Sequence, residues 1–318
     1  MTEGIAKGHF MKRALVIGLL LLAIIVIACV YLLWTPDEDR QSLEARYMHP
    51  PSRYLSVAGI QLRICDTGPR GAPAILLLHG FGSSLETWDA WAKSLTGQFR
   101  VIRLDLPGAG LTGPDPTGDY SDARSVQIIL ALMERLGVAR AAFIGNSIGG
   151  RIAWRFAALE PTHVSKLVLI SPDGFPSPGF AIGQKPDVPY TARLMQFVLP
   201  KFLLRANLEP AYADPVHLSD NVVTRYYDLI LAPGVRSAML ARMAGTVLDD
   251  PGPLLKRVQA PTLLLWGEKD ALIPFSNATD YLKDIPHSIL VPLPGLGHVP
   301  QEEAPSVSLE PVVQFLRR

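Results

Sequence analysis

Cysteine is scarce in this chain of 318 residues, which contains only two. Two cysteines can form at most one disulfide, so a disulfide framework and a cysteine-rich metal site are both excluded. Cys29 lies in a long apolar run and Cys65 in a strand-like stretch, and we interpret both as free thiols. Charge of one sign is not in excess either, because 30 Lys and Arg are balanced by 29 Asp and Glu. A net charge of +1 provides no basic surface for nucleic acid, which we do not expect as a partner.

Long biased runs are also missing, although 28 prolines and 26 glycines are spread through the chain. Their absence excludes collagen, coiled coil and a disordered chain. The sequence contains no cluster with metal-ligand spacing, no phosphate-binding loop and no nucleotide motif, so we predict neither a metal nor a cofactor.

What the chain does contain is an uncharged, proline-free apolar run from Ala14 to Trp34. As a helix this run would span roughly 31 Å, enough to cross a bilayer. Basic residues precede it and acidic residues follow it, which predicts a cytoplasmic N-terminus and an exported remainder. We therefore expect a cytoplasmic segment at 1–13, a transmembrane signal anchor at 14–34, and a single-pass protein whose main domain is periplasmic or extracellular.

Two alternatives to a retained anchor stay open. A cleaved secretory signal has an apolar core of about 7 to 15 residues that ends in small residues. The segment Val26-Ile27-Ala28-Cys29 also resembles a bacterial lipoprotein processing site, at which lipid would be attached to Cys29. The apolar run is longer than a signal core and continues past Cys29 to Trp34, which favours retention.

The rest of the chain has the pattern of one α/β domain with an insertion. Residues 35–53 are polar and proline-bearing, which is typical of a tether. Buried-type apolar runs then alternate with amphipathic stretches, a pattern that predicts a mostly parallel sheet with helices on both faces. Strands are expected at 74–78, 101–104, 141–144, 167–170, 262–266 and 288–291, and helices at 85–95, 121–136, 148–159 and 306–316.

The alternation fails after Asp173, where roughly 80 residues replace a short crossover. Helical stretches at 191–204, 219–231 and 235–248 fall in this gap. An insertion that follows the carboxyl end of a strand lies where open α/β sheets bind ligands, so we predict a helical lid at 176–240. The core is then expected to comprise residues 54–175 and 241–318.

A strand-turn-helix segment contains Gly145-Asn146-Ser147-Ile148-Gly149-Gly150. This G-x-S-x-G pattern predicts that Ser147 occupies a sharp turn and presents its hydroxyl as a nucleophile. The glycines are explained by the same turn, because side chains at 145 and 149 would crowd it.

Two backbone N–H groups are needed to stabilise an oxyanion at Ser147. The residue after the nucleophile, Ile148, supplies one, and the loop His79-Gly80-Phe81-Gly82 supplies the other, which we assign to Phe81. His79 is the alternative general base, but its place on the oxyanion strand favours a role in holding the loop by hydrogen bonds.

An acid and a base follow Ser147 in chain order, each just past a predicted strand. Asp270 lies after the strand at 262–266, and His298 follows the strand at 288–291. This order predicts that His298 exchanges a proton with Ser147 while Asp270 orients the imidazole. Asp173, one strand earlier, remains a rival acid, and Glu268 is expected in solvent.

These motifs resemble the α/β-hydrolase superfamily over about residues 54–318. The matching segments are H-G-F-G at 79–82, D-L-P-G-A-G at 105–110, G-N-S-I-G-G at 145–150, W-G-E-K-D-A-L-I-P at 266–274 and G-L-G-H at 295–298. The resemblance implies an eight-stranded sheet, a lid, the triad and oxyanion roles just given, and a loop-organising role for Asp105.

The resemblance also bears on the reaction. Dehalogenases and epoxide hydrolases of this fold use an aspartate nucleophile, whereas position 147 is serine. The elbow is similar to that of meta-cleavage-product C–C hydrolases, but these often carry tryptophan after the histidine, where Val299 stands here. The default is therefore hydrolysis of a carboxylic ester, as in esterases and lipases. A domain that binds without turnover is a third possibility, although no triad member is lost.

The ester is expected to be a small molecule with an apolar acyl or alcohol part if certain lid residues line the pocket. These residues are Tyr190, Leu194, Phe197, Phe202 and Leu203.

Overall fold

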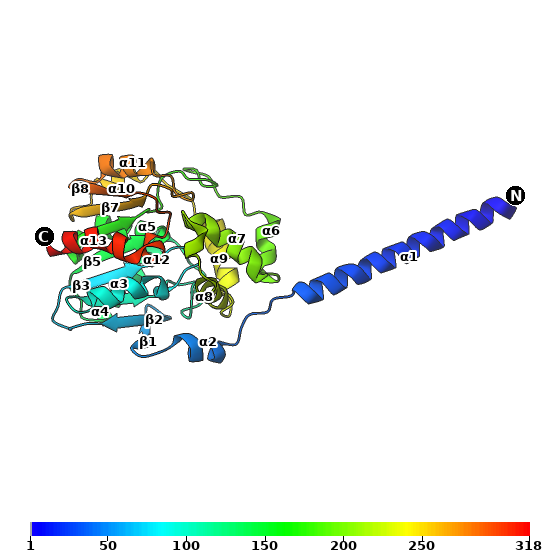
Figure 1. Ribbon diagram of the computed structural model, residues 1–318, viewed down its shortest axis with the longest axis horizontal. Helices are drawn as coiled ribbons and strands as arrows, with labels where there is room; N and C mark the ends of the chain where they lie inside the picture. The colour runs from blue at the N-terminus through cyan, green and yellow to red at the C-terminus, as the bar shows by residue number, and fades with distance from the viewer. Residues whose placement is uncertain (1) are drawn as a thin grey trace.

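A single sheet with helices on both faces forms the body of the molecule (Figure 1). The computed structural model describes residues 2–318, and side chains from Lys12 onward except that of Cys29, so the predictions on the Cys29 side chain lie outside the described residues. The strands are β1 (Ser52–Val57), β2 (Ile60–Thr67), β3 (Ala74–Leu78), β4 (Arg100–Leu104), β5 (Ala141–Asn146), β6 (Val164–Ile170), β7 (Thr262–Gly267) and β8 (Ser288–Leu293).

The eight strands lie in the order β1-β2-β4-β3-β5-β6-β7-β8. β1 and β2 form an antiparallel hairpin, β2 pairs antiparallel with β4, and the other pairs are parallel. This arrangement confirms the predicted sheet, and all six predicted strands are present. Parallel strands align their carboxyl ends, so the loops after β3, β5, β7 and β8 meet at one edge.

Side chains alternate between the two faces along each strand, which divides the core into two layers. On β3, Ile75 and Leu77 pack into one layer, while Leu76 and Leu78 pack into the other. The first layer is covered by α3 (Asp89–Leu95) and α13 (Pro305–Arg317). The second is covered by α4 (Asp122–Arg135), α5 (Ile148–Leu159), α10 (Gly252–Leu255) and α11 (Asn277–Asp284).

A helical insertion joins β6 to β7 at the carboxyl edge of the sheet. It contains α6 (Tyr190–Arg193), α7 (Lys201–Leu208), α8 (Asp220–Ile230) and α9 (Val235–Gly245). The three predicted helical stretches are therefore present, although the first is divided between α6 and α7. The predicted boundary between lid and core after residue 240 falls inside α9, which ends at Gly245.

The segment expected to be a tether contains ordered structure. α2 (Arg40–Tyr47) lies in this segment, and its Leu43 is fully buried among residues of the insertion. The N–H of Thr35 donates to the carbonyl of Phe197 and that of Glu38 to the carbonyl of Leu231, both at 2.8 Å. A polar, proline-bearing composition was thus a poor guide, because these backbone bonds do not depend on side-chain polarity.

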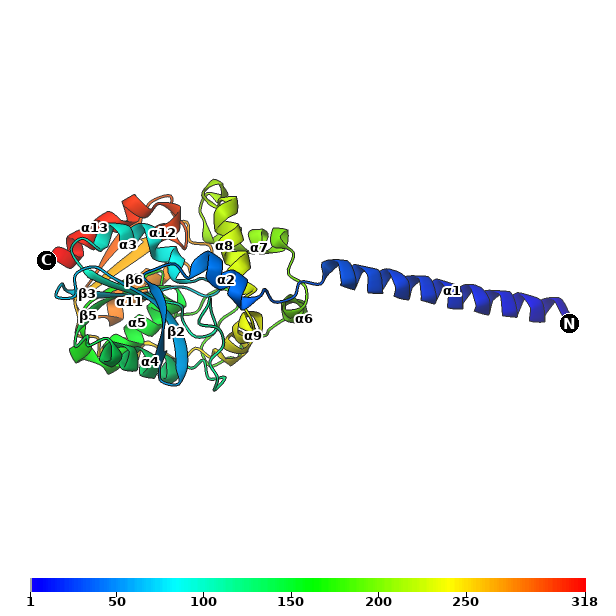
Figure 2. The same ribbon diagram turned by 90° about the horizontal axis from the view of Figure 1, so that it is seen from below.

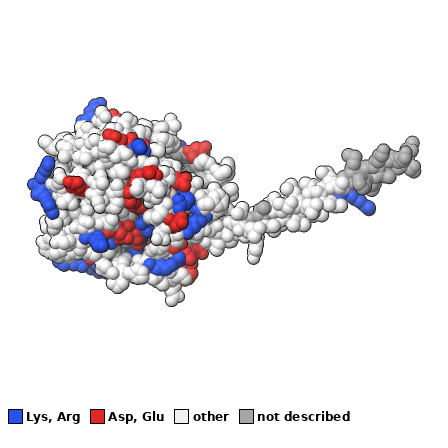
Figure 3. Space-filling view, viewed as in Figure 1, with Lys and Arg blue, Asp and Glu red and all other residues white. Residues whose placement is uncertain are grey.

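The N-terminal run forms α1 (Thr2–Leu33), which extends away from the domain (Figure 2). Within its segment Lys12–Leu33 a window of 18 residues has a mean hydropathy of 3.2, and none of the residues in that window is buried in the protein. Figure 3 shows this stalk without charge over most of its described length, whereas the domain carries charges of both signs. By length and composition the helix could cross a membrane, a property shared by anchors and signal sequences.

Candidate active site

Ser147 lies in a strained turn between β5 and α5. Its φ of 55° and ψ of −123° are unfavourable for a residue with a side chain, and the turn is held by a 3.0 Å bond from its N–H to the carbonyl of Ile170. A Cβ on Gly145 would come within 2.3 Å of the Gly149 carbonyl oxygen, and a Cβ on Gly149 within 2.2 Å of the Leu78 carbonyl oxygen. The two glycines are therefore required for this turn to form.

His298 and Asp270 meet at the same edge of the sheet. The Nδ1 of His298 lies 2.8 Å from Oδ2 of Asp270, and both side chains are buried. The second carboxylate oxygen accepts the N–H groups of Leu272 and Ile273, each at 2.9 Å. Burial alone would raise the pKa of Asp270, but His298 and the hydrogen bond from the Ile273 N–H lower this pKa below its usual value. The carboxylate thus stays ionised and can hold the imidazole with its Nδ1 protonated.

Ser147 and His298 line one cavity of about 250 Å³. Among the described residues the Ser147 hydroxyl has no hydrogen-bond partner, so it shares the cavity with the imidazole without a direct bond. Such bonds are often long or missing without substrate and form in the complex. The remaining lining is mainly apolar and includes Phe180, Met243 and Leu272.

The condition set for an apolar ester, that five apolar residues of the insertion line the pocket, is not met. None of the five lines the cavity, and all are exposed: Tyr190, Leu194, Phe197, Phe202 and Leu203. Helical periodicity shows that a helix has an apolar face, but it does not show which surface that face contacts.

The rival acid Asp173 has a different partner. Its carboxylate lies 3.5 Å from Nη1 of Arg151, and its backbone N–H donates to the Ser147 carbonyl at 3.0 Å. Burial raises the pKa of Asp173 above its usual value despite Arg151. The structure thus brings Asp270, and not Asp173, against His298.

The two residues proposed to supply the oxyanion donors also lie at the cavity. Phe81 and Ile148 both line it, and Ile148 is the first residue of α5, where the N–H has no acceptor within the helix. The loop of Phe81 is held by His79, whose Nδ1 donates to the Gly80 carbonyl at 2.8 Å and whose Nε2 accepts the Leu106 N–H at 2.9 Å. Burial lowers the pKa of His79, so a neutral ring matches this bonding. The imidazole of His79 therefore positions the loop and is not free to act as the base.

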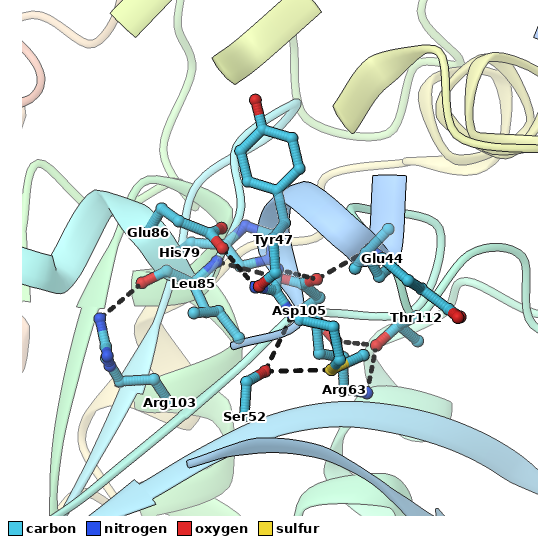
Figure 4. Close-up of polar contacts among 12 residues, drawn as sticks. Glu44, Tyr47, Ser52, Arg63, His79, Leu85, Glu86, Arg103, Asp105 and Thr112 are labelled. Atoms are coloured by element: carbon cyan, nitrogen blue, oxygen red, sulfur yellow. Dashed lines mark hydrogen bonds and ion pairs between the residues drawn. The ribbon is translucent and has the colours of Figure 1, made fainter. Parts of the chain in front are cut away.

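Asp105 organises the neighbouring loops through a buried network (Figure 4). Its two oxygens accept the N–H groups of Leu85 and Leu111, at 2.8 and 2.9 Å. Nη1 of Arg63 donates to the same carboxylate at 3.2 Å, and both side chains are almost fully buried. A Cβ on Gly110 would come within 2.2 Å of Asp105 Oδ2, which explains the glycine. Sequence reasoning identified Asp105 but missed Arg63, because nothing near β2 indicates that partner.

Arg242, on α9, is a second residue that sequence reasoning missed. Its side chain lines the cavity of Ser147 and also an adjoining cavity. No local motif surrounds it, so the sequence carried no signal for this position.

Comparisons with known proteins place this geometry in a family. A model of the alpha/beta hydrolase fold matches residues 73–305. The dihydrolipoyllysine-residue acetyltransferase component of the acetoin cleaving system of Pseudomonas putida is 30% identical over 276 residues, covering 85% of this chain and 70% of its own. The 2-hydroxy-6-oxononadienedioate/2-hydroxy-6-oxononatrienedioate hydrolase of Burkholderia vietnamiensis is 29% identical over 298 residues, covering 84% and 96%.

Among solved structures, a membrane phospholipase A described as a bacterial virulence factor superposes with a TM-score of 0.70. It is 22% identical, and the match covers 96% of this chain and 98% of that one. At this identity the likeness shows the fold alone. The family match, the sheet and the serine turn together show that this chain belongs to the α/β-hydrolase superfamily and has the fold of a hydrolytic enzyme.

Proposed function

We propose that this protein is a membrane-anchored serine hydrolase that cleaves a carboxylic ester through Ser147, His298 and Asp270. The observation that carries the proposal is the pairing of His298 with Asp270, at 2.8 Å, beside the strained turn of Ser147. Ser147 and His298 both line one largely apolar cavity. Nucleophile, base and orienting acid are thereby supplied at one site.

The reaction would proceed in two halves. Nε2 of His298 takes the proton of the Ser147 hydroxyl as its oxygen attacks the ester carbonyl carbon, and the N–H groups of Phe81 and Ile148 stabilise the oxyanion. The alcohol leaves with the proton from the imidazolium, and the acyl group stays on Ser147. Water, deprotonated by His298, then attacks the acyl carbon and releases the carboxylic acid and the free serine. The residues supply every proton transfer, so the proposal includes no cofactor.

The membrane part of the proposal is supported by α1. Its apolar segment is long enough to span a bilayer, and its flanking charges favour an N-in, C-out orientation, with the domain on the exported side. Amphiphilic esters concentrate at membrane surfaces, so an anchored domain would meet them at high local concentration.

A C–C bond hydrolase of the meta-cleavage-product type is the second candidate, favoured by relatives that carry such names. In this chain the Asn146 amide donates to the carbonyls of His298 and Ile170, at 2.9 and 3.1 Å. These bonds link the nucleophile turn to the histidine loop and give Asn146 a structural role that an ester hydrolase needs equally. Val299 follows the histidine, and the proposed exported location is far from cytoplasmic ring-fission products.

The decisive test is hydrolysis by the purified full chain in nonionic detergent. Rates on p-nitrophenyl esters of increasing chain length are compared with rates on a meta-cleavage product, with the Ser147→Ala variant as the control. We expect ester hydrolysis that depends on Ser147. Faster cleavage of the C–C substrate would establish the second candidate, and no turnover of either would point to a binding domain.

Topology needs its own experiment. Protease added to spheroplasts should digest the domain while a cytoplasmic marker survives. A protected domain would refute the orientation, and a mature chain beginning near Cys29 would replace the anchor by processing.

A further inference from the structure

A second cavity adjoins the one that contains Ser147. It has a volume of about 320 Å³ and is lined by residues 118–122, Arg151 and part of α9. Ile148, Arg242 and Thr246 line both cavities. A substrate held at Ser147 could therefore extend past Ile148 into this second space.

Arg242 lies at the junction and is incompletely bonded. Its Nη2 donates to the Pro107 carbonyl at 2.8 Å and its Nη1 to the Tyr120 carbonyl at 3.4 Å. The guanidinium also lies over the Tyr120 ring, 5.1 Å from the centroid. A guanidinium has five N–H donors, so further donors remain for a ligand.

The charge of Arg242 forms no ion pair with any side chain that the structure describes. Arg151, beside it, pairs with Asp122 at 2.7 Å and with Asp173 at 3.5 Å. For Arg242, by contrast, no carboxylate among the described side chains lies within 4.0 Å. Burial lowers its pKa below the usual value, which reflects the cost of a charge removed from water. Such a charge is stabilised when an anion binds beside it.

The acids that line the second cavity are already engaged. Asp122 is held by Arg151 and also by Nε of Arg155, at 2.9 Å. Asp119 accepts the Ser121 N–H at 2.8 Å. The positive charge of Arg242 is therefore the one available to a ligand at this junction, as far as the described residues go.

We propose that Arg242 binds an anionic group of the substrate, a phosphate or a carboxylate, while the apolar part lies beside Ser147. This inference rests on the proposed ester hydrolysis and narrows its substrate class to amphiphilic esters with an anion near the scissile bond. Arg is suited to the task because its fork of donors matches both anions in a two-point contact.

Three matched substrates test the proposal on the full chain in nonionic detergent: the decanoyl esters of glycerol, glycerol 3-phosphate and glyceric acid. We expect kcat/KM for at least one anionic ester to exceed that for the neutral ester by about tenfold or more. Arg242→Gln should lower the ratio of kcat/KM for the anionic ester to kcat/KM for the neutral ester by about 10- to 100-fold. Arg242→Lys should retain part of the preference, because it keeps the charge but not the fork. The better anionic ester identifies the anion as phosphate or carboxylate.

The control is Arg193→Gln, which removes one exposed guanidinium from α6 of the same insertion, outside both cavities. It should leave the preference unchanged. Equal losses on neutral and anionic esters in Arg242→Gln, no anionic preference in the unaltered protein, or the same effect from Arg193→Gln would each overturn the proposal.

A binding measurement separates this inference from the proposed reaction. In the Ser147→Ala background, calorimetry should show tighter binding of decyl phosphate or decanoate than of decanol, and Arg242→Gln should abolish the difference. Anion binding that depends on Arg242 without turnover of any ester would retain the subsite and refute the ester hydrolase. Ester turnover with no difference in binding would refute the anion subsite and retain the ester hydrolase.

Discussion

The nucleophile turn and the junction between α1 and the insertion are both held by hydrogen bonds, but the bonds differ in origin. Around Ser147 both required glycines lie within one short motif, although Gly149 leaves room for the Leu78 carbonyl of a neighbouring strand. At the junction, Arg236 donates to the Thr35 carbonyl at 2.7 Å and to the Asp37 carboxylate at 2.7 Å, across about two hundred residues of sequence. A short motif thus marks the nucleophile turn in the sequence, whereas the junction between the N-terminal helix and the insertion consists of contacts between residues far apart in the sequence.

The junction holds the insertion close to the end of α1. Trp34 stacks on Phe197 of the insertion with ring centroids 5.6 Å apart, directly after the apolar helix ends. Figures 1 and 2 both place α6 and α7 at the end of the domain from which α1 extends. If α1 is held in a bilayer, the exposed apolar residues of the insertion are therefore held near its surface. The predictions below test the two regions in turn.

The largest effect is expected at the nucleophile turn. Ser147→Ala removes the attacking oxygen and should lower kcat by about 10⁵- to 10⁶-fold without a change in thermal stability. Mass spectrometry after treatment with a fluorophosphonate should show one adduct, which maps to Ser147. An adduct at another residue, or an active alanine variant, would disprove the assignment.

The next effect compares the two candidate acids. Asp270→Asn should lower kcat by about 10⁴-fold, because asparagine holds His298 in the wrong tautomer. Asp173→Asn, which alters the contact with Arg151, should cost much less. The kcat values of the two variants, measured with the same short ester, decide the matter, and a reversed order would place the acid one strand earlier.

The buried ion pair of Arg63 and Asp105 should contribute more to the free energy of unfolding than to kcat. Arg63→Ala leaves the fully buried Asp105 without its cation, and removal of one partner of a buried pair costs about 3–5 kcal/mol. We expect a clear fall in melting temperature, with kcat at low temperature largely retained. A matched control is Arg53→Ala, since Arg53 is partly exposed and lies 3.7 Å from Asp66. An equal fall in melting temperature in the two variants would show that the buried pair contributes no more to stability than the partly exposed one.

How well the sequence predicts a region depends on how far apart in the sequence the contacting residues of that region lie. Strands buried on both faces appear as apolar runs, so β3 was predicted with its observed bounds at 74–78. The turn at Ser147 was predictable because its glycines are adjacent in sequence. The buried side of α2 consists of Leu43, and one leucine in a polar segment does not distinguish a packed helix from a tether.

The same limit explains the errors at the site. Phe197 is apolar yet faces outward, and Arg242 is charged yet lines two cavities. Neither residue lies where its type predicts, and the reason is visible only in the way α9 and its neighbours pack against the edge of the sheet. Predictions from residue type therefore worked in the core and failed in the insertion, where the surroundings come from distant segments.

The smallest effect tests the junction by two truncations. Removal of residues 1–34 deletes the apolar helix but keeps the contacts of Thr35 and Asp37, so kcat on a short soluble ester should be unchanged. Removal of residues 1–39 also takes away both of these partners of Arg236, whose buried guanidinium then keeps the Met195 carbonyl at 3.1 Å. An unmatched buried donor costs about 1–3 kcal/mol, which is enough to loosen the insertion locally without unfolding the sheet.

Limited proteolysis provides the measurement for these truncations. Cleavage within 176–245 should be several-fold faster in the shorter chain than in the one that starts at residue 35, while cleavage of the sheet should be equal in both. A single substitution, Asp37→Ala, should give an intermediate rate, because this half-exposed carboxylate provides one side of an ion pair worth about 1 kcal/mol or less. Identical digestion of all three proteins would mean that α1 and the insertion are not coupled through residues 35–39. The insertion would then owe its order to its own packing alone.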